Sequence, residues 1–211
     1  ALATPLFLMV VVNRLAGLRI SAAGKPLEWA RDPYHPYAFQ VRVPEGAGSL
    51  DLRFQFLSPA TSREGALTMT PALINVQWQS MLLYPAGYYV RDIPFVATLK
   101  LPHAFTAFSA LNARQSSDDD VRYAPVSLET LVDSPVYAGR HTRRIPLTTG
   151  AHPVFLDLLA EATPFLAIPD DTIARFTRTM QATERLFGTP PWPRYEMLVR
   201  LSNSFPGPGG V

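Results

Sequence analysis

Between Gly17 and Phe56, apolar and polar residues alternate in short runs that turn-forming residues separate. The runs are Leu18–Ile20, Leu27–Trp29, Ala38–Val43 and Leu50–Phe56, and the turns are Gly24–Pro26 and Pro44–Gly48. Alternation with a period of two puts the apolar side chains on one face of a strand, and turns after about every 8–12 residues are typical of an antiparallel sandwich. The 21 prolines among 211 residues also disfavour a helical bundle. We therefore expect the chain to begin as an antiparallel, β-sandwich-like domain.

Further strands are predicted as far as residue 159, with one helical turn at Ser127–Leu131. We expect Phe95–Leu101 and Ala104–Leu111 to pair around the turn at Pro102–His103. The remaining predicted strands are Leu6–Val12, Ile74–Tyr84, Val136–Gly139, Arg143–Leu147 and Pro153–Leu159.

The apolar start of the chain has two other interpretations, a signal peptide and a membrane span. The run of about a dozen apolar residues is shorter than the ~20 residues that a membrane-spanning helix needs. It also lacks an initiator Met, a basic segment and a small-residue cleavage site, which are marks of a signal peptide. We therefore expect a buried strand at Leu6–Val12 and no membrane partner.

The pattern changes near Asp170, where helical spacing replaces the alternation. Asp170 and Asp171 suit the first turn of a helix, and Gly188 suits its end. The apolar residues at helical spacing are Ile173, Phe176, Met180 and Phe187. The predicted fold class is α+β, mainly β. A β-rich domain covers residues 1–168, and residues 169–211 add one long helix and a strand that begin an incomplete second domain.

Composition excludes some classes of protein. Basic and acidic residues number 19 and 17, so the net charge is only +2 and the sequence pI of 9.1 does not mark a nucleic-acid-binding surface. We expect no nucleic-acid partner. Cysteine is absent, which excludes disulfides and thiolate metal sites. The compartment stays open between a bacterial periplasm and the cytoplasm.

No complete catalytic motif is present in the sequence. The histidines are His35, His103, His141 and His152, and none of them has the spacing of H-E-x-x-H or of a compact zinc site. We interpret His35 and His103 as surface turn residues. The serine-hydrolase motif G-x-S-x-G and the glycine-rich nucleotide-binding loops are also missing.

Three other features have simple structural interpretations. Ser116–Asp120 is acidic but lacks the alternating ligands and glycine turn of a calcium loop, so we expect a solvated turn. The basic run Gly139–Arg144 is expected at a solvated strand edge, where positive charge prevents unwanted pairing. Core packing is the expected role of the tryptophans, which are Trp29, Trp78 and Trp192.

Several phrases of the sequence together resemble one enzyme family. They are Leu15–Ile20 with Leu27–Trp29, Gln77–Trp78 with Leu83–Gly87, Ala124–Gly139, Leu186–Gly188 and Tyr195–Leu198. These phrases resemble the glycyl aminopeptidases, which are zinc metallopeptidases with a β-rich N-terminal domain, a thermolysin-like catalytic domain and usually a PDZ domain. The resemblance runs from about Leu15 to Val211, and residues 1–14 match nothing in it.

The resemblance also implies where the chemistry lies. In the family a Gly-Gly-x-Glu-His motif follows the strand that ends here near Ser202, and an H-E-x-x-H helix comes later. Gly209, Gly210 and Val211 match the first three positions of that motif, so they are the candidate substrate-binding residues. The resemblance thus implies an inactive fragment with no cofactor of its own. Zinc is expected in the full-length parent, whose partners would be the missing catalytic domain and a peptide substrate.

An alternative class is a stand-alone β-sandwich module that binds or scaffolds without catalysis. In that case the predicted helix caps the sheet, and its apolar stripe is buried. In a fragment the same stripe lacks a full partner surface. A membrane-anchored accessory protein, based on the first twelve residues alone, ranks last.

Overall fold

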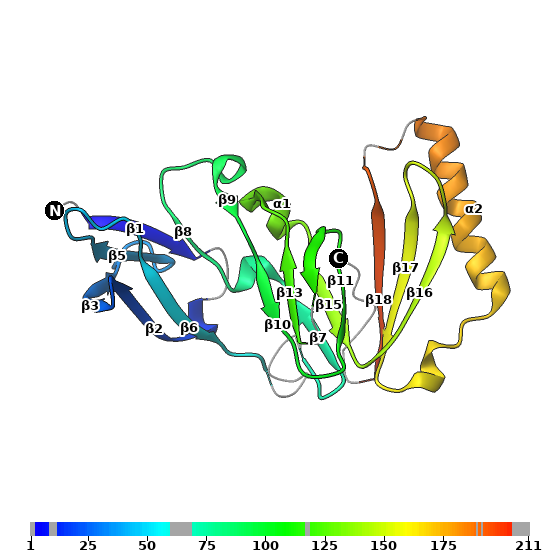
Figure 1. Ribbon diagram of the computed structural model, residues 1–211, viewed down its shortest axis with the longest axis horizontal. Helices are drawn as coiled ribbons and strands as arrows, with labels where there is room; N and C mark the ends of the chain where they lie inside the picture. The colour runs from blue at the N-terminus through cyan, green and yellow to red at the C-terminus, as the bar shows by residue number, and fades with distance from the viewer. Residues whose placement is uncertain are drawn as a thin grey trace. The chain divides into compact units, whose positions relative to one another are not determined.

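The computed structural model describes residues 3–8, 12–59, 69–116, 119–188, 190 and 192–203. The chain folds into two compact units, each of which is described by itself. Unit 1 consists of Ala1–Ser58, Gln77–Pro94 and Ser127–Val132. Unit 2 consists of Pro59–Val76, Phe95–Val126 and Asp133–Val211. Strands dominate both units (Figure 1), so the predicted α+β, mainly β class is confirmed.

Unit 1 contains two small antiparallel sheets with a shared core. The first sheet has the order β4–β5–β1–β8. Its strands are β4 (Trp29–Arg31), β5 (Ala38–Arg42), β1 (Ala3–Leu8) and β8 (Leu83–Pro85). The second has the order β3–β2–β6, with bounds Lys25–Leu27, Leu15–Ala22 and Asp51–Phe56. Both sheets contribute to one buried cluster of Leu6, Leu18, Ile20, Phe39 and Val41. The short helices of the unit are η1 (Val12–Arg14), η2 (Trp78–Ser80), η3 (Val90–Asp92) and α1 (Leu128–Val132).

Unit 2 contains three sheets of three strands each. Their orders are β10–β13–β12, β11–β15–β7 and β16–β17–β18. In the first sheet, β10 is Thr98–Lys100, β13 is Asp120–Tyr123 and β12 is Ala113–Ser116. In the second, β11 is Thr106–Phe108, β15 is Val136–Gly139 and β7 is Leu73–Val76. In the third, β16 is His141–Thr148, β17 is Val154–Ala160 and β18 is Tyr195–Leu201. Strands β9 (Pro94–Phe95) and β14 (Val126–Ser127) lie where the chain passes between the units. In the three sheets only β17 and β18 pair in parallel.

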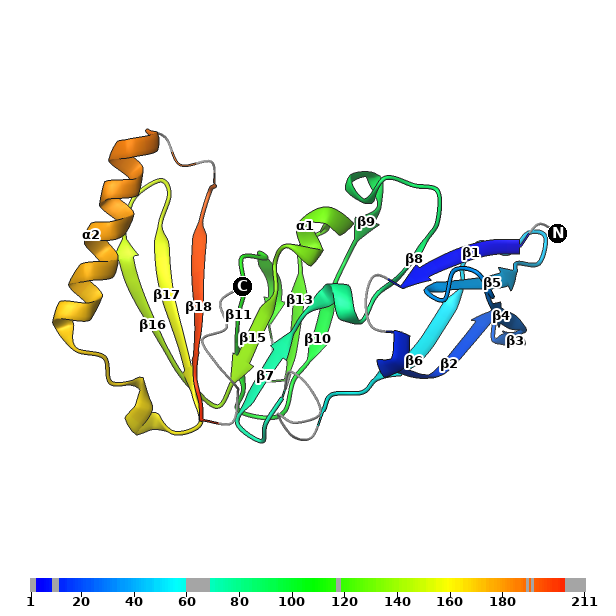
Figure 2. The same cartoon turned by 180° about the vertical axis from the view of Figure 1, so that it is seen from behind.

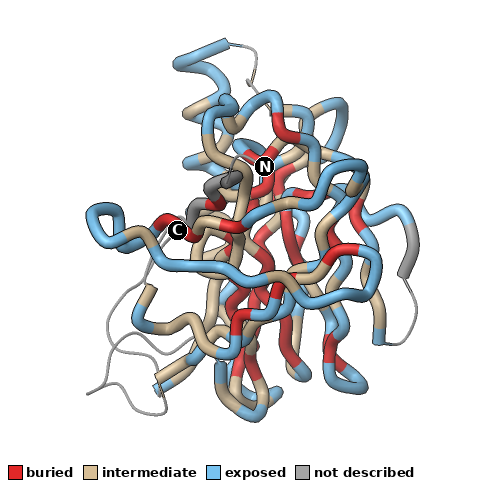
Figure 3. The backbone as a smooth tube through the Cα atoms, turned by 90° about the vertical axis from the view of Figure 1, so that its left-hand side faces the viewer, coloured by how far each residue is buried: buried red, intermediate tan, exposed pale blue. Residues whose placement is uncertain are grey.

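The middle sheet of unit 2, β11–β15–β7, is covered on both faces. Leu73, Phe108 and Tyr137 pack on one face against Leu159 and Leu198 of the third sheet. The other face packs through Ala138 against the hairpin sheet β10–β13–β12. All four residues of β15 are therefore buried. Figure 3 shows the buried residues of the chain in red. A strand buried on both faces reads as continuously apolar in sequence.

Helix α2 (Asp170–Phe187) covers the remaining face of the sheet β16–β17–β18 (Figure 2). Ile173, Phe176 and Met180 pack on the cluster formed by Leu156 and Leu158 of β17 and their neighbours. The helix ends at Gly188 with φ +76° and an amide that donates to the Glu184 carbonyl, a conformation that glycine adopts without strain. Within the described residues, no helix has both the length and the apolar character needed to cross a bilayer.

Several sequence predictions are confirmed. The long helix has its predicted bounds and its predicted glycine end, although Pro169, not Asp170, is the N-cap residue. The predicted helical turn is α1, and Val136–Gly139 is β15. The strands predicted at Arg143–Leu147 and Pro153–Leu159 are the antiparallel pair β16 and β17. The boundary at residues 168/169 stays a prediction, and it falls within unit 2.

Three other strand predictions are wrong or too long. Ile74–Tyr84 is not one strand, because β7 ends at Val76 and the chain turns through η2 before β8. Leu27–Trp29 divides between β3 and β4, which belong to different sheets. The strand predicted at Leu6–Val12 ends at Leu8 as β1, and η1 begins at residue 12. Apolar runs do not show where the chain leaves one core for another, which explains these errors.

The predicted pairing of Phe95–Leu101 with Ala104–Leu111 is also wrong. The chain does turn at Pro102–His103, and Ala104 has a φ of +64°. However, β10 before the turn pairs with β13, whereas β11 after it pairs with β15. The turn therefore connects two sheets and closes no hairpin.

Candidate functional site

Strand β18 is the strand that precedes the candidate substrate-binding residues of the family resemblance. It pairs in parallel with β17 along its whole length, residues 195–201 opposite residues 154–160. The predicted substrate-binding residues Gly209, Gly210 and Val211 follow this strand but lie outside the described residues. Their role stays a prediction. The described part of the candidate site consists of β18 and the elements that hold it in place.

A cluster of charged side chains joins the three strands of this sheet. Arg144 of β16 donates two hydrogen bonds to Asp157 of β17, from Nε to Oδ1 at 2.7 Å and from Nη2 to Oδ2 at 2.9 Å. Its Nη2 also donates to Oε2 of Glu196 in β18 at 2.8 Å. The Asp157 and Glu196 side chains are 0% and 1% exposed. Both carboxylates therefore need the arginine to compensate their buried charge.

Two aromatic rings enclose the guanidinium of Arg144. Its central carbon lies 4.9 Å from the ring centroid of Phe108 and 4.7 Å from that of Phe155. A cation over an aromatic face is attracted by the ring quadrupole. Because Phe108 belongs to β11, the arginine also joins the third sheet of unit 2 to the middle one. The prediction of a solvated strand edge at Gly139–Arg144 holds in part, because β16 is an edge strand and the Arg144 side chain is 40% exposed. The guanidinium of Arg144 nevertheless binds two buried carboxylates.

Arg194 fixes the beginning of β18 to the loop after β11. Its Nη2 is shared among the backbone oxygens of residues 109–111 at 3.0–3.2 Å, and its Nη1 donates to Oδ1 of Asn112 at 3.2 Å. Its Nε lies 2.7 Å from Oε1 of Glu196, in an ion pair without hydrogen-bond alignment. Glu196 thus contacts two arginines, one from its own strand segment and one from β16.

A third carboxylate holds the other end of β18. Glu161 accepts a hydrogen bond from Oγ of Ser202 at 2.7 Å and another from Oγ1 of Thr70 at 3.2 Å. Side chains therefore anchor β18 immediately before its first residue and immediately after its last one. Such anchoring suits a strand that must present its backbone in a fixed position.

The charged cluster shifts the ionisation of two of its members. Burial and the adjacent Asp157 carboxylate raise the pKa of Glu196 to about 8, and the positive charges of Arg144 and Arg194 oppose this shift. The hydrogen bond to Asp157 raises the pKa of the Arg144 guanidinium. Glu196 is therefore the member of the cluster that can exchange a proton near neutral pH.

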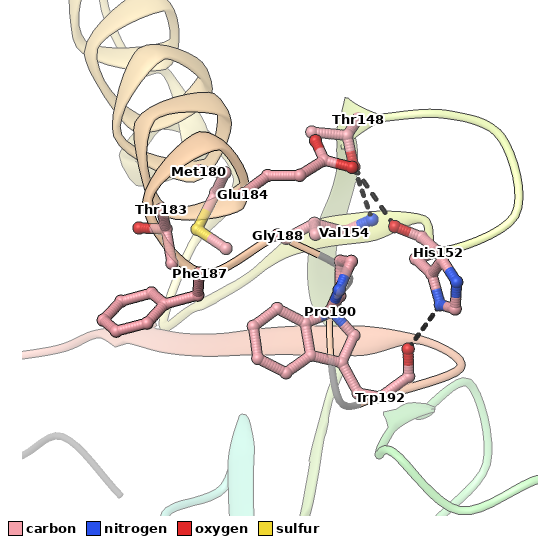
Figure 4. Close-up of a pocket in the computed structure, with 10 residues that line it drawn as sticks. All are labelled: Thr148, His152, Val154, Met180, Thr183, Glu184, Phe187, Gly188, Pro190 and Trp192. Carbon is pink, nitrogen blue, oxygen red and sulfur yellow. Dashed lines mark hydrogen bonds between the residues drawn. The ribbon is translucent and has the colours of Figure 1, made fainter.

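A pocket of about 400 Å³ lies beside the end of α2 (Figure 4). Its apolar lining is Val154, Met180, Phe187, Pro190 and Trp192, and its polar lining is Thr148, His152, Thr183 and Glu184. The Phe187 side chain remains exposed to 75%. His152 forms a hydrogen bond within the pocket wall, since its Nδ1 lies 2.6 Å from the Trp192 carbonyl oxygen. The pocket is therefore an apolar surface and not a set of catalytic groups.

The tryptophans differ from one another in burial. Trp78 is buried as predicted, Trp192 is half-buried in the pocket wall, and Trp29 is 38% exposed. Core packing therefore accounts fully for Trp78 alone.

The histidines do not come together into a metal site. His103 forms an exposed ion pair with Asp119 at 3.5 Å, as a surface turn residue would. His141 contacts Oγ1 of Thr163 at 2.9 Å. Over the described ranges of the chain, no three His, Asp or Glu side chains lie close enough to hold a metal ion.

Sequence comparison now places the chain in a family. The profile of the peptidase M61 N-terminal domain matches residues 10–140, which is more than half of the chain. The chain belongs to this family. The matched region ends at the start of β16, so the charged cluster and α2 lie almost entirely beyond it. A search among curated proteins finds no match.

Solved structures with a similar fold cover more of the chain. An aminopeptidase N family protein from Idiomarina loihiensis matches with a TM-score of 0.72 and 14% identity, over 93% of this chain and 34% of that one. Native yeast LTA4 hydrolase matches with a TM-score of 0.55 and 13% identity, over 95% of this chain and 32% of that one. Legionella pneumophila aminopeptidase A in complex with aspartic acid matches with a TM-score of 0.53 and 11% identity, over 94% of this chain and 24% of that one. These likenesses show the fold alone, and the chain spans about a third or less of each protein.

The charged cluster of Arg144, Asp157, Arg194 and Glu196 was not predicted from the sequence. One signal was available, because Asp157 is the one carboxylate in the otherwise apolar strand β17. A charge buried in such a strand requires a partner. The identity of the partners depends on strand register, which the sequence does not show.

Proposed function

We propose that this chain is the non-catalytic N-terminal portion of a zinc-dependent aminopeptidase of the glycyl aminopeptidase type, in which residues 169–211 begin the catalytic domain. The rest of the polypeptide is proposed to carry zinc and the catalytic groups. The proposed substrate is the amino end of a peptide.

One observation carries this proposal. The M61 N-terminal profile covers residues 10–140, and the fold shared with the aminopeptidase N family protein covers 93% of the chain. A coverage of 93% means that the shared fold extends beyond the family match, into the residues after 140. This supports a chain that continues from the N-terminal domain into the first elements of a peptidase domain.

Strand β18 would form one wall of the substrate cleft. Its position is fixed by Arg194 and Glu196 at one end and by Ser202 at the other. In this proposal Gly209, Gly210 and Val211 are the first three residues of the Gly-Gly-x-Glu-His motif. The described residues gather no zinc ligands, so no zinc-dependent step is assigned to them.

The test compares two proteins, residues 1–211 alone and the same sequence extended along its reading frame. Reading the coding sequence past Val211 should give a Glu-His pair at once and an H-E-x-x-H segment later. The extended protein should hydrolyse glycyl- or alanyl-p-nitroanilide, and a chelator should abolish that activity. Residues 1–211 should bind no catalytic zinc and hydrolyse neither substrate.

Two results would contradict the proposal. A stop codon after Val211 would leave no catalytic domain to complete. Chelator-sensitive hydrolysis by residues 1–211 alone would place the active site within this chain.

A stand-alone binding or scaffold module is the second candidate, and the packing of α2 favours it in part. Ile173, Phe176 and Met180 of the predicted stripe pack against the sheet, whereas Phe187 and its neighbour Leu186 are 75% and 76% exposed. A self-sufficient module should unfold cooperatively and bind little hydrophobic dye. A fragment should bind dye at the end of α2, and replacing Leu186 and Phe187 by Ser should reduce that binding.

A further inference from the structure

Two arginines face each other on the exposed side of the sheet β3–β2–β6 in unit 1. Arg19 of β2 lies directly opposite Arg53 of β6, and both side chains are exposed. Residues opposite each other in an antiparallel pair have Cβ atoms about 4.5–5.5 Å apart, and like charges there repel. In the part of the chain that the structure describes, neither guanidinium has a carboxylate within ion-pair distance.

A β-bulge creates this arrangement. Gly17 and Leu18 of β2 together oppose a single residue of β6, and Gly17 has a φ of +62° that favours glycine. The extra residue allows Leu15 and Leu18 both to contact the core. It also brings Arg19 opposite Arg53. Bulges occur often where a strand must direct a side chain towards a site.

The arginine pair lines a groove of about 480 Å³. Trp29 forms an aromatic wall that is 38% exposed. Its Nε1 donates to the Leu18 carbonyl oxygen at 3.2 Å, and its ring packs edge-on against Phe39 at 5.5 Å. The ring is thus held rigidly while one side of it stays accessible. Ser21 and Asp51, which oppose each other in the next row, complete the polar lining.

The charges in the groove select the ligand. Arg19 and Arg53 carry two positive charges and Asp51 carries one negative charge, so the lining is left with a net charge of +1. A carboxylate matches this charge and accepts hydrogen bonds from two planar guanidinium groups. A phosphate would bring more negative charge close to Asp51, and the accessible face of Trp29 suits an apolar group beside the anion.

We propose that this groove binds a peptide carboxylate with an adjacent apolar side chain. The ligand's carboxylate bridges Arg19 and Arg53, and its apolar side chain lies on Trp29. This site lies within unit 1 and uses no residue of the sheet β16–β17–β18, so it is independent of the proposed peptidase activity.

The experiment titrates the full 211-residue chain with three probes and follows the Trp29 indole N–H and the arginine side-chain resonances by NMR. The probes are N-acetylphenylalanine, its uncharged primary amide and inorganic phosphate. N-acetylphenylalanine should shift both sets of resonances in a saturable way. The amide and phosphate should bind at least about tenfold more weakly, because each lacks one of the two features that the groove recognises.

Matched variants then test the residues. Arg19→Gln and Arg53→Gln should each weaken binding of N-acetylphenylalanine by about tenfold, whereas Arg91→Gln, an exposed arginine of η3 in the same unit, should leave it unchanged. Both groove variants should melt at or above the temperature of the parent chain, because repulsion is removed. Lost binding therefore cannot reflect unfolding.

Three results would overturn the proposal. Equal binding of the acid and the amide would show that the arginines do not select a carboxylate. Tightest binding of phosphate would indicate a general anion site. Unchanged affinity in both groove variants would place the bound ligand elsewhere.

Discussion

Arginines occupy two contrasting environments in this protein. In unit 2, Arg144 reaches two buried carboxylates and is enclosed by Phe108 and Phe155. In unit 1, Arg19 and Arg53 face each other on an exposed sheet surface, and among the described residues neither has a carboxylate within ion-pair distance. The first environment uses the charge to hold three strands together, and the second leaves the charge available to a ligand.

The contrast follows from desolvation. A buried charge costs several kcal/mol unless a partner compensates it, so buried clusters are complete within the chain itself. An exposed charge is solvated by water and can remain unpaired at a cost of only tenths of a kcal/mol. A charged cluster whose members all have partners within the chain is therefore structural. An exposed charge without a partner is the better indication of a binding site.

The largest predicted effect breaks the complete cluster. Asp157→Asn removes the charge that accepts two hydrogen bonds from Arg144, and should lower the free energy of unfolding by about 3 kcal/mol. Urea denaturation followed by circular dichroism measures this change. The exposed ion pair of Arg175 and Asp171 provides a control, because Asp171→Asn on the helix surface should cost at most about 0.5 kcal/mol.

A double substitution separates charge from packing. Arg144→Met combined with Asp157→Leu should be more stable than Asp157→Asn alone, because it removes the charges of Arg144 and Asp157 together and Glu196 keeps Arg194 as its partner. A double variant that is as unstable as the single one would show that shape, and not charge compensation, makes the cluster necessary.

The origin of this cluster shows how far the sequence could predict the structure. The helix α2 was predictable, because Ile173, Phe176 and Met180 follow its period and Gly188 ends it. The cluster was not, since Arg144 and Glu196 meet Asp157 only through the registers of an antiparallel and a parallel pairing. Local patterns determine a helix, whereas long-range pairing determines which distant charges meet.

The same limit explains the failed strand predictions. Ile74–Tyr84 alternates apolar and polar residues and ends in an apolar run, but its two ends belong to different compact units. Apolarity shows that residues are buried without showing in which core. The predicted substrate-binding residues Gly209, Gly210 and Val211 rest on resemblance alone and stay a prediction.

The second prediction concerns close packing around Gly139 of β15, which lies directly opposite Leu73 of β7 in the middle sheet. A Cβ atom at Gly139 would lie 2.8 Å from Cδ2 of Leu73 and 3.1 Å from the backbone oxygen of Ala72. Gly139→Ala should therefore lower the free energy of unfolding by about 2 kcal/mol, measured by urea denaturation. Gly48→Ala should have little effect, since nothing lies within 4 Å of that position. Equal stability of the two variants would mean that Leu73 and the chain at Ala72 move aside at little cost.

The third prediction uses the titration of Glu196. Its pKa rises from 4.5 in the unfolded chain to about 8 in the folded one, so between these values the folded state holds the extra proton. The free energy of unfolding should therefore fall as the pH rises through this window. Glu196→Gln mimics the protonated form, so its free energy of unfolding should fall less than that of the parent chain between pH 5 and 8. Parallel pH profiles would show that Arg144 and Arg194 keep Glu196 ionised throughout.

The smallest predicted effect tests the incomplete pair in unit 1. Arg53→Gln removes a like charge directly opposite Arg19, so the free energy of unfolding should rise by about 0.2–1 kcal/mol at low salt. Added salt should reduce the gain, because the charges are exposed and therefore screened. Arg91→Gln should leave stability unchanged under both conditions. Thermal melts at two ionic strengths measure these differences, and a loss of stability in Arg53→Gln would show that Arg53 already has a partner within the folded chain and is not kept for a ligand.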